Sequence, residues 1–72
     1  MNEETFLKEM VNILDTEVNI DMTTTLDSVD EWDSLALINY LSAMSNYTNK
    51  RLSTDKIRNA KTIGDLYTIA SE

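Results

Sequence analysis

Apolar residues recur at spacings of three and four near the start of the chain, which is the spacing of one face of an α helix. This pattern predicts a helix over residues 3–15. Asn2 can cap that helix, and Glu3 and Glu4 suit the positive end of its dipole. The apolar stripe consists of Phe6, Leu7, Met10, Val11, Ile13 and Leu14.

The periodic pattern stops between Asp15 and Asp33. Apolar residues in this stretch stand singly among Asp, Thr, Asn and Ser, so we expect a long loop over residues 16–33 that these side chains pin to the core. Loops longer than about 12–15 residues are uncommon in compact domains and are often functional. The isolated apolar residues are Val18, Ile20, Met22, Leu26, Val29 and Trp32.

The helical period returns after the loop. Asp33 and Ser34 both suit an N-cap, and the apolar residues that follow predict a second helix over residues 34–47. A polar stretch then leads to a helix start signal at residues 53–55. This signal predicts a third helix of only one or two turns.

A capping signal marks a fourth helix. Thr62 and Asp65 resemble a capping box, and the apolar face beyond them reaches about residue 70. Gly64 lies in the first turn, where it costs less than the roughly 1 kcal/mol of a glycine in a helix interior. The chain shows no strand alternation and no internal repeat. The predicted fold of residues 1–72 is therefore a single all-α domain, a four-helix bundle of three longer helices and one short helix with a long loop between the first two.

The chain lacks the residue types on which most small catalytic and metal sites depend. Its 72 residues include no cysteine and no histidine, which excludes disulfides, zinc bound by thiolate or imidazole, a Cys nucleophile and a Ser-His-Asp triad. We expect no enzyme activity and no metal site. The formal net charge of −7 argues against nucleic acid and anionic membranes as partners. No apolar signal core and no apolar run near the roughly 20 residues of a membrane span is found, so we expect a cytoplasmic monomer.

The negative charge is concentrated in the first half of the chain. Residues 1–33 hold ten acids and one base, Lys8, whereas residues 34–72 hold three acids and five bases. The first part therefore carries a net charge of −9 and the second +2. The bases form a cluster that could pair with the acidic loop or contact a partner, although a solvated surface is the simplest explanation for them; they are Lys50, Arg51, Lys56, Arg58 and Lys61.

The order of these elements, with Asp33-Ser34-Leu35 at the start of the second helix, resembles the acyl carrier protein family. The resemblance covers nearly the whole chain, and the segment Lys61-Thr62-Ile63-Gly64-Asp65-Leu66 is similar to the start of that family's last helix. An Asp-Ser-Leu triplet alone has little specificity. Near mid-chain, after a long loop in an acidic chain of this length, it is far more specific.

The resemblance implies that Ser34 carries 4'-phosphopantetheine, taken from coenzyme A by a phosphopantetheinyl transferase. The thiol of this arm would hold an acyl group as a thioester for the enzymes that load and transfer it. A helix N-terminus favours a phosphate oxygen, and a loop junction leaves the hydroxyl accessible. A simple N-cap is the alternative interpretation of Ser34. The identity of the cargo and the pathway do not follow from the sequence.

The resemblance also gives the neighbouring residues roles. Asp33 would orient the serine or help to hold the transferase's metal, or it would serve simply as a helix cap. Leu35 would face partner enzymes, and Ile38 would lie near the mouth of the cavity between helices, although a core position explains Ile38 equally well. Trp32 could contact the arm or a partner, or it could pin the loop over the core. Within the core, Tyr40, Met44 and Tyr47 could fill the space that a long acyl chain would need.

Two departures from the family pattern affect these expectations. Asp30, Glu31 and Trp32 stand where Leu, Gly and a small residue are usual, which puts a standard loop conformation in doubt. Residues 35–48 contain no charged residue, whereas fatty-acid carriers place acids on this helix. We therefore expect that the partner enzymes bind a neutral surface on this helix, and that the protein serves a dedicated pathway. Two alternatives stay open: an aminoacyl or peptidyl carrier, which usually has Gly-Gly before the attachment dipeptide, and an unmodified helical adaptor.

Overall fold

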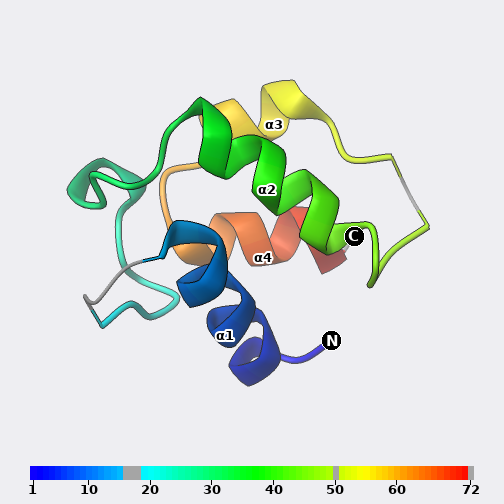
Figure 1. Cartoon of the computed structure of the whole chain (residues 1–72), viewed down its shortest axis with the longest axis horizontal. Helices are drawn as coiled ribbons and strands as arrows, with labels where there is room; N and C mark the ends of the chain where they lie inside the picture. The colour runs from blue at the N-terminus through cyan, green and yellow to red at the C-terminus, as the bar shows by residue number, and fades with distance from the viewer. Residues whose placement is uncertain (16–18, 50, 72) are drawn as a thin grey trace.

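The chain forms four α helices in the predicted order (Figure 1). A computed structural model describes residues 1–15, 19–49 and 51–71. In these ranges the all-α class is confirmed, and no β strand is present. The α helices are α1 (Glu3–Leu14), α2 (Ser34–Met44), α3 (Thr54–Asn59) and α4 (Ile63–Ser71), and a short 3-10 helix, η1 (Leu26–Ser28), lies in the loop after α1. None of the helices in the described ranges is long and apolar enough to cross a bilayer.

The predicted ends of α1 and α2 were too late. Asp15 has a left-handed backbone conformation, φ 50° and ψ 47°, so α1 ends at Leu14. The helix α2 ends at Met44 rather than at residue 47, because the chain tightens there. The backbone N–H of Tyr47 donates to the carbonyl of Met44 at 2.9 Å, an i to i−3 bond.

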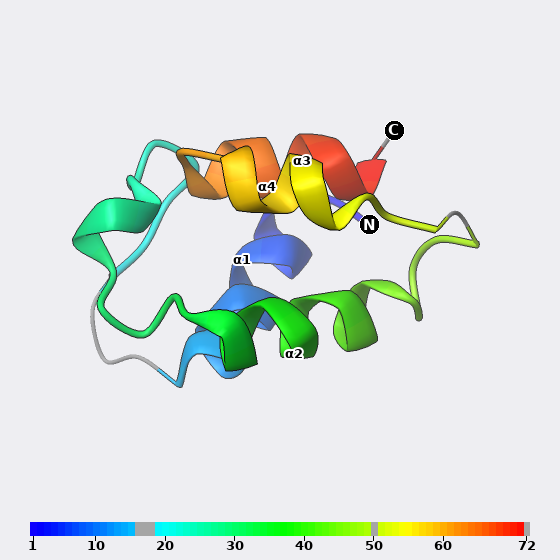
Figure 2. The ribbon, with the colours of Figure 1, turned by 90° about the horizontal axis from the view of Figure 1, so that it is seen from above.

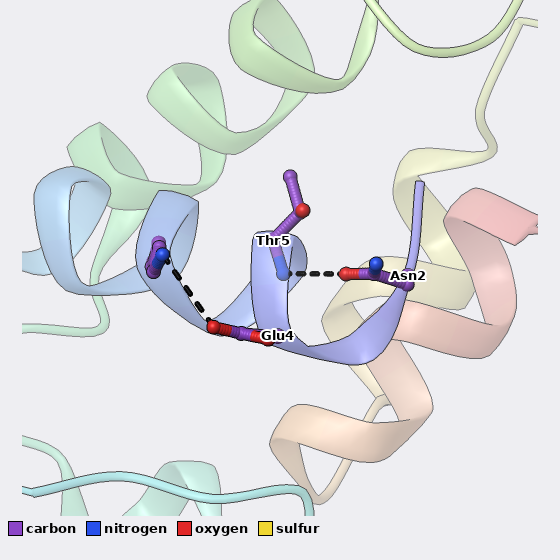
Figure 3. A network of polar contacts seen from close by, with 4 residues as sticks. Asn2, Glu4 and Thr5 are labelled. Carbon is purple, nitrogen blue, oxygen red and sulfur yellow. Dashed lines mark hydrogen bonds and ion pairs between the residues drawn. The ribbon is translucent and has the colours of Figure 1, made fainter.

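The N-cap predicted for α1 is confirmed. The Asn2 side-chain oxygen accepts a hydrogen bond from the backbone N–H of Thr5 at 2.8 Å (Figure 3). One turn further on, Lys8 and Glu4 form an exposed ion pair at 3.6 Å. An exposed pair of this kind adds only a few tenths of a kcal/mol. The start of α1 therefore depends mainly on its cap.

The capping box predicted for α4 is also confirmed. The backbone N–H of Asp65 donates to the hydroxyl of Thr62 at 3.1 Å, and the backbone N–H of Thr62 donates to the Asp65 carboxylate at 3.2 Å. The backbone N–H of Lys61 donates to the same carboxylate oxygen at 3.0 Å. These bonds lower the pKa of Asp65 below its usual 3.8, because they favour the charged form.

The helices pack in two pairs around one core. Contacts join α1 to α2 and α3 to α4. Seen from above, α3 and α4 lie on one side and α2 on the other, with α1 between (Figure 2). The two ends of the chain lie close together, since Met1 and Ser71 line one groove with Tyr47, just past α2. The buried core residues are Phe6, Met10, Leu14, Leu26, Val29, Ala36, Tyr40, Met44, Ile57, Ile63, Leu66 and Ala70.

A row of aromatic rings crosses this core. Trp32 meets Tyr40 with ring centroids 6.2 Å apart, Tyr40 meets Phe6 at 6.4 Å, and Phe6 meets Tyr67 at 5.2 Å. All three contacts are edge-on, which is a favourable arrangement for aromatic rings. The hydroxyl of Tyr40 donates to the carbonyl of Leu66 at 2.6 Å, and burial raises the pKa of Tyr40. This bond ties α2 to α4 inside the core.

The loop between α1 and α2 is attached along the start of α4. Leu26 and Val29 are buried, and Ile20, Met22 and Trp32 are half-buried, so five of the six predicted pins reach the core; Val18 lies outside the described residues. The backbone N–H of Leu26 donates to the carbonyl of Lys61 at 2.8 Å, and the loop carbonyls accept from the first amides of α4. Nothing local in the sequence predicts this pairing.

Candidate functional site around Ser34

Ser34 is the first residue of α2, and its side chain is exposed. The helix begins here because Asp33 caps it: the Asp33 backbone is extended, and its carboxylate accepts a hydrogen bond from the backbone N–H of Ala36 at 2.9 Å. The cap interpretation of Asp33 is thereby confirmed. It leaves Ser34 beside the cap, where its hydroxyl is open to solvent.

The start of α2 favours a bound anion beside Ser34. The first amides of any helix have no intrahelical partner, and the helix dipole places partial positive charge there. The cap uses the Ala36 amide, and the first turn of α2 contains no acidic residue. The amides of Ser34 and Leu35 therefore lie where a phosphate on the serine oxygen would be stabilised.

A surface cleft of about 380 Å³ opens directly beside Ser34. Its apolar walls come from Trp32 before the helix and from Leu37 and Ile38 on α2. Arg58 lines it from α3 and brings a positively charged residue to the cleft that Asp33 also lines. The cleft thus combines an attachable hydroxyl, an apolar wall and a cation.

A second groove adjoins the start of α2. It measures about 300 Å³ and runs between the end of α1 and the first turns of α2. Leu35 lines this groove, together with the carboxylates of Asp15, Glu31 and Asp33. Asp33 lines both the cleft and the groove, so the two adjoin at the start of α2.

Leu35 and Ile38 form an exposed apolar surface around the serine. Leu35 is 65% exposed and Ile38 is 59% exposed. Ile38 is therefore not a core residue, although a core stripe explained its spacing equally well. Ser34 and these two exposed aliphatic side chains lie within five residues on the first turns of α2, which gives the start of the helix a small apolar patch.

Trp32 lies both on the core and on the cleft. Its ring packs edge-on against Tyr40 while another part of the half-buried side chain forms the cleft wall. The sequence presented pinning of the loop and contact with the arm as competing roles. The geometry makes them compatible, because Trp32 packs against Tyr40 and also lines the cleft.

The proximity of Arg58 to Ser34 was not predicted. In the sequence, Arg58 is one member of a basic cluster with a solvated surface as its simplest explanation. Its position depends on where the short helix α3 packs, and a six-residue helix has too little periodicity to reveal that. The sequence carries no local signal that could have found it.

The three residues expected to fill a cavity behave differently. Tyr40 and Met44 are fully buried, whereas Tyr47 is 42% exposed. The hydroxyl of Tyr47 donates to the carboxylate of Glu9 at 3.1 Å, and this bond raises the pKa of Tyr47. Tyr47 therefore does not occupy the core.

In the described part of the chain, no three carboxylates converge in a way that could hold a metal ion.

No family model, no curated protein and no solved structure matches the chain. The functional assignment therefore depends on the sequence order and on the arrangement around Ser34.

Proposed function

We propose that this chain is an acyl carrier protein that bears 4'-phosphopantetheine on Ser34. The observation that carries the proposal is an exposed serine at the first position of a capped helix, beside a cleft with an apolar wall and Arg58. The resemblance of the whole chain to the carrier family, with its four-helix bundle and long first loop, gives the same assignment. The protein acts as a cytoplasmic monomer.

Loading would proceed by phosphoryl transfer from coenzyme A. The Ser34 oxygen forms a bond to the phosphorus next to the pantetheine, and the bond from that phosphorus to adenosine 3',5'-bisphosphate breaks. The serine proton passes to a base of the transferase. Asp33 keeps the helix start in place and lies where it could help to hold the transferase's metal, while the amides at the start of α2 stabilise the new phosphodiester.

The arm supplies a thiol that forms thioesters, and partner enzymes supply the remaining chemistry. This division of labour suits a chain without cysteine or histidine. The residues fit the arm, because Arg58 offers charge to the phosphodiester, whereas Trp32, Leu37 and Ile38 offer apolar surface to the pantetheine. The carrier itself contributes position and recognition.

Partner enzymes would contact the neutral surface of α2 near Leu35 and Ile38. Negative charge lies before the helix, in Asp27, Asp30, Glu31 and Asp33, rather than along it. A dedicated biosynthetic pathway follows from this, because electrostatic complementarity largely sets encounter rate and partner choice. Acyl transfer by a standard fatty-acid synthase partner should be slow and weakly dependent on salt; fast transfer that collapses with added salt would contradict this.

An unmodified adaptor is the second candidate, favoured by the exposure of Leu35 and Ile38. In that case α2 would present an apolar face to a groove on a partner protein, and Ser34 would act only as a helix residue. This candidate predicts that a transferase leaves the chain unchanged.

One experiment decides between carrier and adaptor. The apo protein is incubated with coenzyme A, magnesium and a broad-specificity phosphopantetheinyl transferase, and its intact mass is measured. We expect one arm on the wild type and on Ser42→Ala, a matched change of an exposed serine in the same helix, and none on Ser34→Ala. No added mass on the wild type, or equal addition to Ser34→Ala, would refute the carrier proposal.

A further inference from the structure

We infer that Tyr40 closes the interior to the cargo, so that the acyl group on the arm stays in the surface cleft beside Trp32 and is short. This inference depends on the proposed function. It goes further by assigning a class of cargo, short acyl groups rather than long aliphatic chains, and by naming the residue that sets the limit.

The route from the cleft into the core is blocked by the aromatic row. Trp32 forms the cleft wall, and Tyr40 lies directly behind it with ring centroids 6.2 Å apart. Phe6 follows at 6.4 Å. Tyr40 and Phe6 are fully buried, so a chain that entered past Trp32 would have to displace two rings that pack edge-on against each other.

Tyr40 is also held in place by a hydrogen bond. Its hydroxyl donates to the Leu66 carbonyl at 2.6 Å, and both groups lie inside the core. A chain that displaced the ring would leave the buried Tyr40 hydroxyl without its acceptor. Displacement of an aliphatic side chain would carry no such penalty, so Tyr40 resists entry more strongly than a leucine would.

The surface cleft provides a different place for a modest cargo. Its volume of about 380 Å³ lies at the lower end of the roughly 300–1,000 Å³ typical of ligand pockets. The phosphodiester would lie near Arg58, and the pantetheine with a short acyl group would lie along Leu37, Ile38 and Trp32. A long chain would extend from this cleft into water.

In the test, a phosphopantetheinyl transferase loads the intact protein on Ser34 from a series of acyl-coenzyme A donors. The acyl groups range from acetyl to dodecanoyl, and the Tm of each loaded protein is measured. Each buried methylene would raise Tm by roughly 3–6 °C. We expect the wild type to gain less than about 1 °C per methylene beyond butyryl. A Tm that climbs by about 3 °C or more per methylene would overturn the inference.

Two variants locate the limit at Tyr40. Tyr40→Phe keeps the ring but loses the hydrogen bond to Leu66, and its Tm should rise less with chain length than that of Tyr40→Leu because the ring still fills the space. Tyr40→Leu opens space behind Trp32, and its Tm should rise with chain length. A flat profile for a folded Tyr40→Leu would overturn the role of Tyr40, and if that variant does not fold, the wild-type series still decides.

A second measurement does not depend on Tm. The amide hydrogen-exchange rates of the loaded and unloaded wild type should differ at Trp32, at the start of α2 and in α3. The rate at Leu66 should be the same in both. A change at Leu66 that grows with chain length would overturn the inference. Failure of the proposed function is seen separately, as the absence of any arm on Ser34 in the intact mass, and it would overturn the inference as well.

Discussion

Gly64 offers a test in which helix propensity and packing predict opposite signs. It is the second residue of α4, where glycine is less favourable than alanine. Its backbone N–H donates to the Met22 carbonyl at 2.8 Å. A Cβ atom added at Gly64 would lie 2.8 Å from that same carbonyl oxygen and 3.6 Å from the Met22 Cβ.

The packing term should exceed the propensity term. Alanine gains at most about 1 kcal/mol over glycine, and less in a first turn. Because the atom in the way is backbone, the loop must retreat by at least about 0.6 Å to reach a normal contact distance. That movement weakens the Gly64 bond to Met22 and the neighbouring bond from Ile63 to Thr24, each worth about 1 kcal/mol. Overpacking of this kind typically costs about 1–3 kcal/mol.

We therefore expect Gly64→Ala to destabilise the fold by about 1–2 kcal/mol. A domain of this size would lose roughly 5–15 °C in Tm. Urea unfolding followed by circular dichroism measures the change, with an unchanged m-value as the sign that the unfolded state is the same. Asn12→Ala, at an exposed site in α1, is the control and should be neutral or slightly stabilising. A Gly64→Ala protein as stable as the wild type would refute the reasoning from the close contact.

Three further predictions follow from the caps and the loop. The pKa of Asp65 is lower in the folded protein than in the unfolded chain, so Asp65 stabilises the fold fully above the unfolded pKa and loses this effect as pH falls through the folded pKa. Asp65→Asn should therefore reduce Tm near pH 7 and weaken the fall of Tm between about pH 5 and pH 2. Parallel Tm profiles for the variant and the wild type would contradict this. Asp33→Ala should lower the free energy of unfolding by about 1 kcal/mol, because the N-cap of α2 is lost. Asp33→Ser should restore stability but not the rate of loading if the carboxylate serves the transferase. Equal loading of Asp33→Ser and the wild type would limit the role of Asp33 to capping. Amides of α3 and of the loop over 19–33 should exchange faster than those of α1 and α2, apart from Leu26, which donates to Lys61; uniform protection would show that the loop opens only with the whole fold.

The parts of the fold that the sequence predicts are those with local signals. Asn2, Asp33 and the Thr62–Asp65 pair each cap a helix as their type and spacing indicate. The position of Ser34 at the start of α2 follows from the same signals. Helix ends were less accurate, because the left-handed turn at Asp15 and the tightened turn after Met44 depend on how the chain leaves the helix.

The missed features all join residues far apart in the sequence. Arg58 reaches the Ser34 cleft only because α3 packs where it does. The sequence indicated only a small destabilisation from Gly64 in the first turn of a helix. In the structure, the Met22 carbonyl lies so close that a residue with a Cβ atom would clash there, so the position requires glycine. The cleft wall likewise depends on Trp32 meeting Tyr40. Such contacts arise from tertiary packing, and no periodicity in a single sequence encodes them.

The closeness of the two chain ends has a practical consequence for tethering. Met1 and Ser71 share a groove with Tyr47, beyond the C-terminal end of α2, while Ser34 lies at the opposite end of that helix. In Figure 1 both termini accordingly lie away from the start of α2. A short Gly-Ser linker could join them, and new ends could be opened in the exposed connection before α3. Attachment next to Met1 or Ser71, or at the permuted ends, would allow these residues to be immobilised or fused to an enzyme with the serine still exposed.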